Sequence, residues 1–326
     1  MENINWLEKL TTRVIESGDG ICWEEALKLQ QLPLKDLINT AGKIRHHFHH
    51  NKIYACSIIN AKSGMCSEDC AFCAQSSHHQ ANSPVYELID PAKIIQDALQ
   101  YAQAGATQFS VVTSGYQVTA KDLDNICRAA KIIKAETSLS LCASLGMLDA
   151  NMAVKLKQAG FSNYHHNIET APSFFPEICT THAFDEDLAT LENARKAGLN
   201  VCCGGIIGLG ESWKQRIELA FTLRELEVNS IPLNFLNPIP GTKLANNKLV
   251  SPKAALRTIA LFRFINPTKH IGICGGREVT LRDLQSWIFR AGADGLMMGN
   301  YLTTAGRSIN DDVAMIADLE MIYESI

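Results

Sequence analysis

Apolar residues follow two alternating patterns along most of this chain. Short apolar runs bounded by turn residues predict strands, which span residues 54–60, 108–113, 138–144, 164–169, 201–207, 231–236, 270–274 and 295–298. Apolar residues at helical spacing predict helices between them, at residues 91–104, 120–134, 149–159, 185–197, 213–227, 252–264, 281–291 and 311–322. Eight strand–helix units predict a (β/α)8 barrel of the TIM type, with an open doubly wound sheet as the alternative.

The segment before the first predicted strand has a helical pattern instead. Trp6, Leu10 and Val14 share one helical face, and Pro33 suits the first turn of a later helix. The predicted organisation is therefore a helical extension at residues 1–50 followed by one barrel domain at residues 51–326. Histidines crowd the end of the extension, which fits a solvated helix end better than a metal-binding tract.

Composition excludes several classes of protein. The 326 residues are 46% hydrophobic and 20% charged, as in a globular protein with a large core. A net charge of −4 gives no reason to expect nucleic acid or an anionic membrane as partner. No apolar run approaches the roughly 20 residues of a membrane span, and Glu2, Glu8 and Lys9 argue against a signal peptide. We expect a cytoplasmic protein, whose eleven cysteines serve metals or the core rather than disulfides.

Three cysteines directly after the first predicted strand are the strongest chemical signal. Cys66, Cys70 and Cys73 have the spacing C-x3-C-x2-C. Iron–sulfur clusters are normally held by four cysteines, so three thiolates can hold a cubane whose fourth iron is open to another ligand. A zinc loop is the alternative, but neither a partner C-x2-C nor a compact histidine pair completes it. The loop follows a strand, so it lies at the barrel face where such folds place their chemistry.

The cysteine spacing, with Phe72 before the last cysteine, resembles the signature of the radical S-adenosylmethionine (SAM) superfamily. Residues 56–75, 164–170, 201–211 and 237–242 resemble biotin synthase, and their order and spacing hold from about residue 40 to 310. The resemblance implies a sulfurtransferase that inserts sulfur into dethiobiotin. SAM would bind the open iron of a [4Fe–4S] cluster and yield a 5′-deoxyadenosyl radical, and an auxiliary cluster inside the barrel would donate sulfide. A flavodoxin or ferredoxin as electron donor and a homodimer are implied as well.

The resemblance also assigns a SAM-binding set. It contains Phe72, Thr113, Ser114 and Gly115, together with Gly204, Ile206, Gly208 and Glu211. Tight strand-to-helix turns explain the glycines equally well. Asp187 departs from the family, which usually has an arginine there, near the SAM carboxylate.

The auxiliary-cluster ligands depart from the family pattern too. Ser110 stands where the family has a cysteine, and Gly272 stands where it has an arginine ligand. Cys274 lies two residues beyond Gly272 and so shares its strand face. Cys202 and Cys203 are neighbours in one strand and cannot both face inward; the resemblance places Cys202 inward.

Our hypothesis is that Cys142, Cys202 and Cys274 hold an auxiliary cluster unlike the usual four-ligand [2Fe–2S] type. A cubane is the natural candidate, and the iron that these cysteines leave open can carry an extra sulfide for donation. The alternative is that Cys274 is a packing residue and the chain has lost its sulfur donor.

Dethiobiotin contacts are expected from amide and carboxylate side chains on two strands. Asn167 and Glu169 share one face of the fourth strand, and Asn234 lies on the sixth. Such groups match the N–H donors and the carbonyl acceptor of a ureido ring, although capping or core hydrogen bonds are the alternative. Two other functions stay open: a related radical SAM enzyme, such as a hydrogenase maturase or methylornithine synthase, and a non-catalytic iron–sulfur protein.

Overall fold

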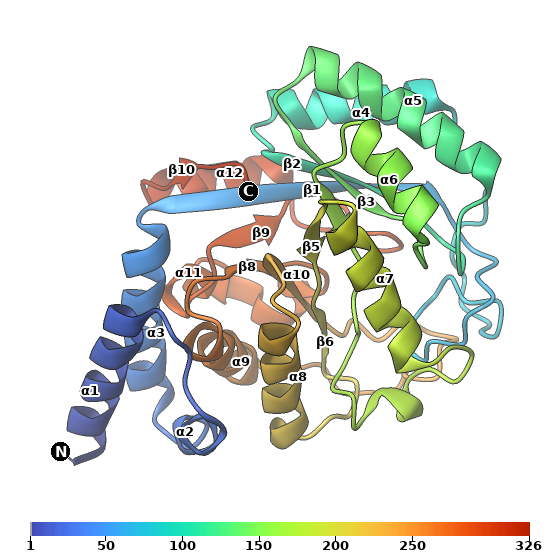
Figure 1. The fold of residues 1–326 in the computed structure, drawn as a ribbon. Coiled ribbons are helices and arrows are strands. Elements are labelled where there is room, and N and C mark those ends of the chain that lie inside the picture. The colour runs from blue at the N-terminus through green and yellow to red at the C-terminus, as the bar shows by residue number, and fades with distance from the viewer. Residues whose placement is uncertain (1) are drawn as a thin grey trace.

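Three helices precede the first strand. The structure is a computed structural model that describes the backbone of residues 2–326 and the side chains of residues 5–326. The helices are α1 (Glu2–Ser17), α2 (Trp23–Leu29) and α3 (Leu34–His49). Buried Leu37 and Ile44 place one face of α3 in the core. Figure 1 shows these helices in blue, lying on one side of the molecule beside α9.

Parallel strands form the centre of the molecule. They are β1 (Lys52–Lys62), β2 (Gln108–Thr113), β3 (Ser140–Ser144), β4 (Asn163–His165), β5 (Asn200–Cys202), β6 (Gly205–Ile207), β7 (Ser230–Phe235), β8 (His270–Ile273) and β9 (Gly295–Met297). From β1 to β5 each strand pairs with the next; β5 and β6 both pair with β7, β7 pairs with β8, β8 pairs with β9, and β9 pairs back with β1. Because β5 and β6 are two halves of one barrel strand, eight positions close the ring. The predicted barrel is confirmed, and the open sheet is excluded.

Helices cover the outside of this ring (Figure 1). They are α4 (Pro91–Gln103), α5 (Ala120–Glu136), α6 (Ala150–Gln158), α7 (Phe184–Lys196), α8 (Trp213–Glu225) and α9 (Pro252–Ile265), with a short 3₁₀ turn, η1 (Phe175–Glu177), before α7. Side chains of Asp90, Thr119, Asp149, Ser212 and Ser251 accept hydrogen bonds from the first turns of five of these helices. Such caps supply partners for otherwise free backbone N–H groups, and the helices begin within one residue of the predicted positions.

The C-terminal elements differ from the prediction. The single helix expected at residues 281–291 is wrong: α10 (Arg277–Leu281), a 3₁₀ turn η2 (Arg282–Leu284) and α11 (Trp287–Arg290) replace it. Arg282 has φ +52° and so interrupts the helix. Helix α12 (Ile309–Asp318) ends early, because Ile322–Tyr323 form β10 beside β1.

A buried carboxylate joins several elements at the N-terminal end of the barrel. Asp294 accepts hydrogen bonds from Arg263 and His270 at 2.6 Å and from the backbone N–H of Ile271 at 2.7 Å. His49, at the end of α3, lies 3.4 Å from the same carboxylate. One histidine of the cluster that ends the extension is therefore buried, whereas His46, His47 and His50 are exposed as expected. Among the described residues, no helix combines the length and apolar character that a bilayer crossing requires.

Candidate active site

A cavity of about 420 Å³ occupies the barrel interior and opens toward the C-terminal ends of the strands. Each barrel strand, or the residue directly after it, contributes to the lining. Both predicted cysteine sets border this one cavity: Cys66, Cys70 and Cys73 from the loop after β1, and Cys142, Cys202 and Cys274 from the barrel. The structure therefore brings together two groups of thiols that are far apart in the sequence.

The loop that carries the first three cysteines is folded back on itself. The side-chain carbonyl of Gln75 accepts hydrogen bonds from the Ser63 hydroxyl at 3.0 Å and from the Gly64 N–H at 3.2 Å. The backbone N–H of Cys66 donates to the backbone carbonyl of Gln75 at 3.0 Å. Three half-buried thiols on a closed loop beside a cavity suit a cluster with one open iron, because soft thiolates are the ligands such clusters require.

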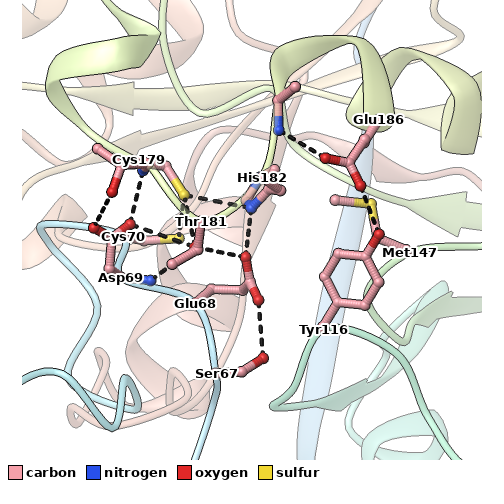
Figure 2. Close-up of polar contacts among 12 residues, drawn as sticks. Ser67, Glu68, Asp69, Cys70, Tyr116, Met147, Cys179, Thr181, His182 and Glu186 are labelled. Atoms are coloured by element: carbon pink, nitrogen blue, oxygen red, sulfur yellow. Dashed lines mark hydrogen bonds and ion pairs between the residues drawn. The ribbon is translucent and has the colours of Figure 1, made fainter.

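Two carboxylates dock the cysteine loop on the segment that follows η1 (Figure 2). Asp69 accepts hydrogen bonds from the backbone and the hydroxyl of Thr180, at 2.8 and 2.7 Å. Burial raises the pKa of Asp69, but these hydrogen bonds outweigh it and hold the pKa well below its usual range. Glu68 accepts from Thr181 at 2.7 Å and lies 2.7 Å from Nδ1 of His182. The loop position is thus set by charge-assisted hydrogen bonds.

Cys179 is a neighbour of the cysteine loop that the sequence did not reveal. Its Sγ accepts a hydrogen bond from Cys70 at 3.8 Å and lies 3.3 Å from Nδ1 of His182 (Figure 2). The Cys70 hydrogen bond, followed by those of His182 and Thr181, lowers the pKa of Cys179 to about 4, although burial opposes this. The same Cys70–Cys179 contact raises the pKa of Cys70. No local sequence pattern marked Cys179, because its partner Cys70 is distant in sequence.

The deeper cysteines are enclosed in the barrel. Burial raises the pKa of Cys142 and Cys274, and raises that of Cys202 to about 11. These thiols are neutral without a metal, so metal binding would release their protons. Cys203 faces the opposite side and is buried in the apolar core, as expected for the neighbour of an inward residue. A fourth cysteine, Cys56 of β1, also lines the cavity, and the sequence analysis did not single it out.

Asn167, Glu169 and Asn234, predicted to contact the substrate, line the same cavity. The Asn167 carbonyl accepts from the Gly204 N–H at 3.1 Å, and the Asn234 carbonyl accepts from the Gly275 N–H at 2.9 Å. Part of the hydrogen-bonding capacity of both amides is thus used within the protein. Burial, and next the charge of Asp187, raise the pKa of Glu169 to about 8. Glu169 is therefore protonated at neutral pH and can donate a hydrogen bond as well as accept one.

Five of the predicted SAM-binding residues border the cavity: Phe72, Thr113, Ser114, Gly115 and Ile206. The Ser114 hydroxyl donates to the Gly64 carbonyl at 2.8 Å, which ties the end of β2 to the cysteine loop. The other three, Gly204, Gly208 and Glu211, do not border it. Glu211 accepts hydrogen bonds from the backbone N–H of Gly208 and Gly210 and from Arg216, at 2.9, 3.1 and 2.7 Å, so it shapes the turn after β6.

Residues that replace the family's arginines have other partners here. Asp187 is buried and lies 2.7 Å from Nε2 of His166 and 3.5 Å from Nε2 of His182. A carboxylate cannot pair with the carboxylate of SAM, so Asp187 cannot make the contact that the resemblance implies for an arginine at this position. Gly272 has no free space beside it, because an added Cβ would lie 2.2 Å from the Tyr54 hydroxyl. Arg277, three residues after Cys274, is fully buried and pairs with Asp312 at 2.6 Å.

Comparisons with known proteins agree with this geometry. Residues 62–223 match the Radical SAM superfamily model, and residues 232–322 match the model of the Biotin and Thiamin Synthesis associated domain. Biotin synthase of Geotalea uraniireducens (strain Rf4) is 53% identical over 97% of this chain and 97% of that protein. Biotin synthase of Syntrophus aciditrophicus (strain SB) is 53% identical over 94% of this chain and 96% of that protein.

Solved structures of more distant proteins share the fold. A methylornithine synthase superposes with a TM-score of 0.83 at 20% identity, covering 97% of each chain. The FeFe-hydrogenase maturase HydG from Carboxydothermus hydrogenoformans gives 0.79 at 17% identity, covering 99% of this chain and 82% of that one. Identities this low support the fold alone, whereas 53% identity over nearly the full length supports membership. The chain belongs to the biotin synthase family of the radical SAM superfamily.

Proposed function

We propose that this protein inserts sulfur into dethiobiotin to give biotin in a SAM-dependent radical reaction. The observation that carries the proposal is that two separate cysteine sets border one cavity of the barrel. The first set alone suffices for a cubane with one open iron. The second set, deep in the barrel, provides a site for the sulfur donor. The 53% identical relatives named biotin synthase support the same conclusion.

The first cysteine set suits a [4Fe–4S] cluster with SAM on its open iron. When bound there, the cluster and SAM together supply the radical chemistry. The protein encloses this site: Ile206, Phe235 and Leu236 contribute an apolar lining that limits water near the reacting groups. Phe72 and the segment Thr113–Gly115 are proposed to contact SAM, while Gly204, Ile206, Gly208 and Glu211 shape the β6 turn against it.

The polar side chains of β4 and β7 are proposed to hold the ureido ring of dethiobiotin. In its neutral form, Glu169 can donate to the ureido carbonyl. The oxygens of Asn167 and Asn234 each accept one backbone hydrogen bond already, and a carbonyl oxygen has a second lone pair for a ureido N–H. A matched set of donors and acceptors fixes the ring and so positions the reacting carbons.

Cys142, Cys202 and Cys274 are proposed to hold the auxiliary cluster that supplies sulfide. Three thiolates without the family's arginine favour a cluster other than the usual [2Fe–2S] type. A cubane fits, and an iron that these three cysteines do not bind can carry an additional sulfide. We further propose a flavodoxin or ferredoxin as electron donor, a homodimer, and a cytoplasmic location.

Metal analysis and turnover test the function together. After anaerobic reconstitution, wild type should hold about 8 irons, two cubanes of four, and Cys274→Ala should hold about 4. Cys203→Ala is the matched control, since this neighbour of Cys202 faces the apolar core and should keep both clusters. With dithionite, SAM and dethiobiotin, wild type should form 5′-deoxyadenosine and biotin.

Three results would contradict the proposal in distinct ways. About 4 irons in both wild type and Cys274→Ala would mean that Cys274 is a packing residue. Formation of 5′-deoxyadenosine without biotin would indicate another radical SAM reaction. Absence of 5′-deoxyadenosine would leave an iron–sulfur protein without turnover.

A further inference from the structure

Cys56 is a cavity-lining thiol with no assigned role. It lies in β1 between Tyr54 and Ile58, and all three side chains line the cavity. The alternate residues Ala55 and Ile59 are buried in the apolar core outside the ring. This alternation fixes Cys56 as an inward residue of the barrel.

The strand register places Cys56 level with one of the proposed cluster ligands. Cys56 pairs with Gln108 of β2, and Gln108 pairs with Ser140 of β3. Cys142 lies two residues further along β3, on the same inward face. The strands of a barrel are tilted relative to the barrel axis. Inward residues of alternate strands therefore lie at one level when a step across two strands is combined with a shift of two residues along the chain, and such residues form one layer. Cys56 and Cys142 therefore belong to the same layer.

The same step repeats around the whole barrel and returns to its starting point. Through Asn163 and Asn200, the step leads from Cys142 to Cys202. Through Ser230 and His270, it leads from Cys202 to Gly272. Through Gly295 and Tyr54, it leads from Gly272 back to Cys56. One layer of the barrel thus has three cysteines and one glycine at its four corners.

The fourth thiol comes from just above the glycine corner. Gly272 has no side chain, and Cys274 lies two residues further toward the cavity mouth on the same face. All four thiols line the one cavity, and they surround the barrel axis on β1, β3, β5 and the end of β8.

We propose that Cys56 is the fourth protein ligand of the auxiliary cluster. Four cysteines are the usual closure of an iron–sulfur cluster. Ser110 borders the same cavity on β2, but its hydroxyl is a harder and weaker ligand for this kind of iron than a thiolate. With Cys56 bound, a cubane has a thiolate on every iron, so the sulfide that the proposed function requires is one of the bridging sulfides of the cluster instead of an additional terminal one.

Because this ligand role presupposes the auxiliary cluster of the proposed function, the test is made on that cluster alone. A background variant, Cys66→Ser/Cys70→Ser/Cys73→Ser, removes the first cluster. Reconstituted anaerobically with ⁵⁷Fe, it should hold about 4 irons and about 4 acid-labile sulfides, with all irons in one sulfur-ligated Mössbauer class. Adding Cys56→Ser should move one quarter of the iron signal to a higher isomer shift, as oxygen replaces sulfur. Adding Cys203→Ser should leave the spectrum unchanged.

Two results would overturn the ligand role while leaving the proposed function intact. The first is a Cys56→Ser spectrum and iron content identical to the background. The second concerns the background variant itself. If one quarter of its iron already has a separate Mössbauer signal, and the variant holds about 5 acid-labile sulfides per cluster, then one iron is bound by a ligand other than Cys56. A background without iron would overturn the auxiliary cluster itself, and with it both the proposed sulfur donor and the ligand role. Far-ultraviolet circular dichroism of each variant establishes that it is folded.

Discussion

Gly272→Ala tests how the barrel accommodates a missing arginine. An added Cβ at this position would lie 2.2 Å from the Tyr54 hydroxyl oxygen and 2.9 Å from Cζ of the same ring. The ring cannot retreat toward β9, because a Cβ at Gly295 would already lie 2.2 Å from its Cε1 atom. The two glycines therefore hold the Tyr54 ring between them. An alanine at position 272 must push this ring toward the cavity.

The expected cost follows from two opposing effects. Overpacking a dense core usually costs about 1–3 kcal/mol. Replacing glycine by alanine restricts the unfolded chain and returns about 0.4–1 kcal/mol. The backbone of Gly272 is not in the left-handed region, so no further conformational cost arises. The central values of these two ranges give a net destabilisation of roughly 1.3 kcal/mol, measured as a lower urea midpoint of the cluster-free protein. The displaced ring should also lower the iron content of the auxiliary cluster.

Tyr54→Phe serves as the control, and the double variant with Gly272→Ala measures the coupling between the two positions. Tyr54→Phe removes the atom at 2.2 Å and leaves the nearest ring atom at 2.9 Å, so most of the clash disappears. The double variant should therefore be more stable than the two single effects predict, with a coupling of about 0.5–3 kcal/mol, as for residues in contact. An unchanged urea midpoint and unchanged iron content in Gly272→Ala would refute the reasoning. So would strictly additive effects in the double variant.

Three further predictions concern other parts of the chain. Asp294→Asn removes a charge that Arg263 pairs with at 2.6 Å in a buried setting, so unfolding in urea should become easier by about 3–5 kcal/mol. Burial raises the pKa of Asp294, but the His270 hydrogen bond and the charge of Arg263 lower it to about 2. The stability that the Asp294 carboxylate contributes should therefore be present above the ordinary pKa of an aspartate and be lost as the pH falls toward 2. Acid unfolding of Asp294→Asn should lack this pH-dependent loss. Glu169→Gln mimics the neutral acid, so kcat/KM at pH 7 should change little. We expect kcat/KM of wild type to decline above pH 8 and that of the variant not to; an equal decline in both would assign it to another group. Diamide should oxidise Cys70 and Cys179 of cluster-free wild type to a disulfide that blocks reconstitution of the cluster. Cys179→Ser should still accept iron after the same treatment. If peptide mass spectrometry finds no Cys70–Cys179 disulfide, the prediction is wrong.

The barrel was predictable because every barrel strand has its own apolar run and nearly every connection has an amphipathic helix. The helix expected at residues 281–291 failed because apolar spacing does not reveal backbone conformation. At Arg282 the chain turns left-handed, and the side-chain amide of Gln285 donates to the Arg282 carbonyl at 2.8 Å. That contact belongs to the tertiary structure, and no local pattern marks it.

The candidate site was predictable where the residues that act together lie close to one another in the sequence. Three cysteines within eight residues form a pattern by themselves. Cys179 contacts Cys70 only because the chain returns after η1, so its role required the fold. Cys56 is an intermediate case. Alternation in its strand indicates that it faces inward, but only the register of all the barrel strands shows which residues share its layer.

The layer arrangement bears on the nuclearity of the auxiliary cluster. The four terminal ligand atoms of a [2Fe–2S] rhomb lie close to one plane, whereas those of a cubane point to the corners of a tetrahedron. Cys56, Cys142 and Cys202 belong to one layer of the barrel, and Cys274 lies two residues above the fourth corner. At the rise of a parallel strand, that displacement is about 6.6 Å toward the cavity mouth. Three thiols at one level and a fourth above them match a tetrahedron better than a plane. With no side chain at position 272 and a thiol at position 274, the four cysteines of this chain form a cage that suits a cubane rather than a flat ring.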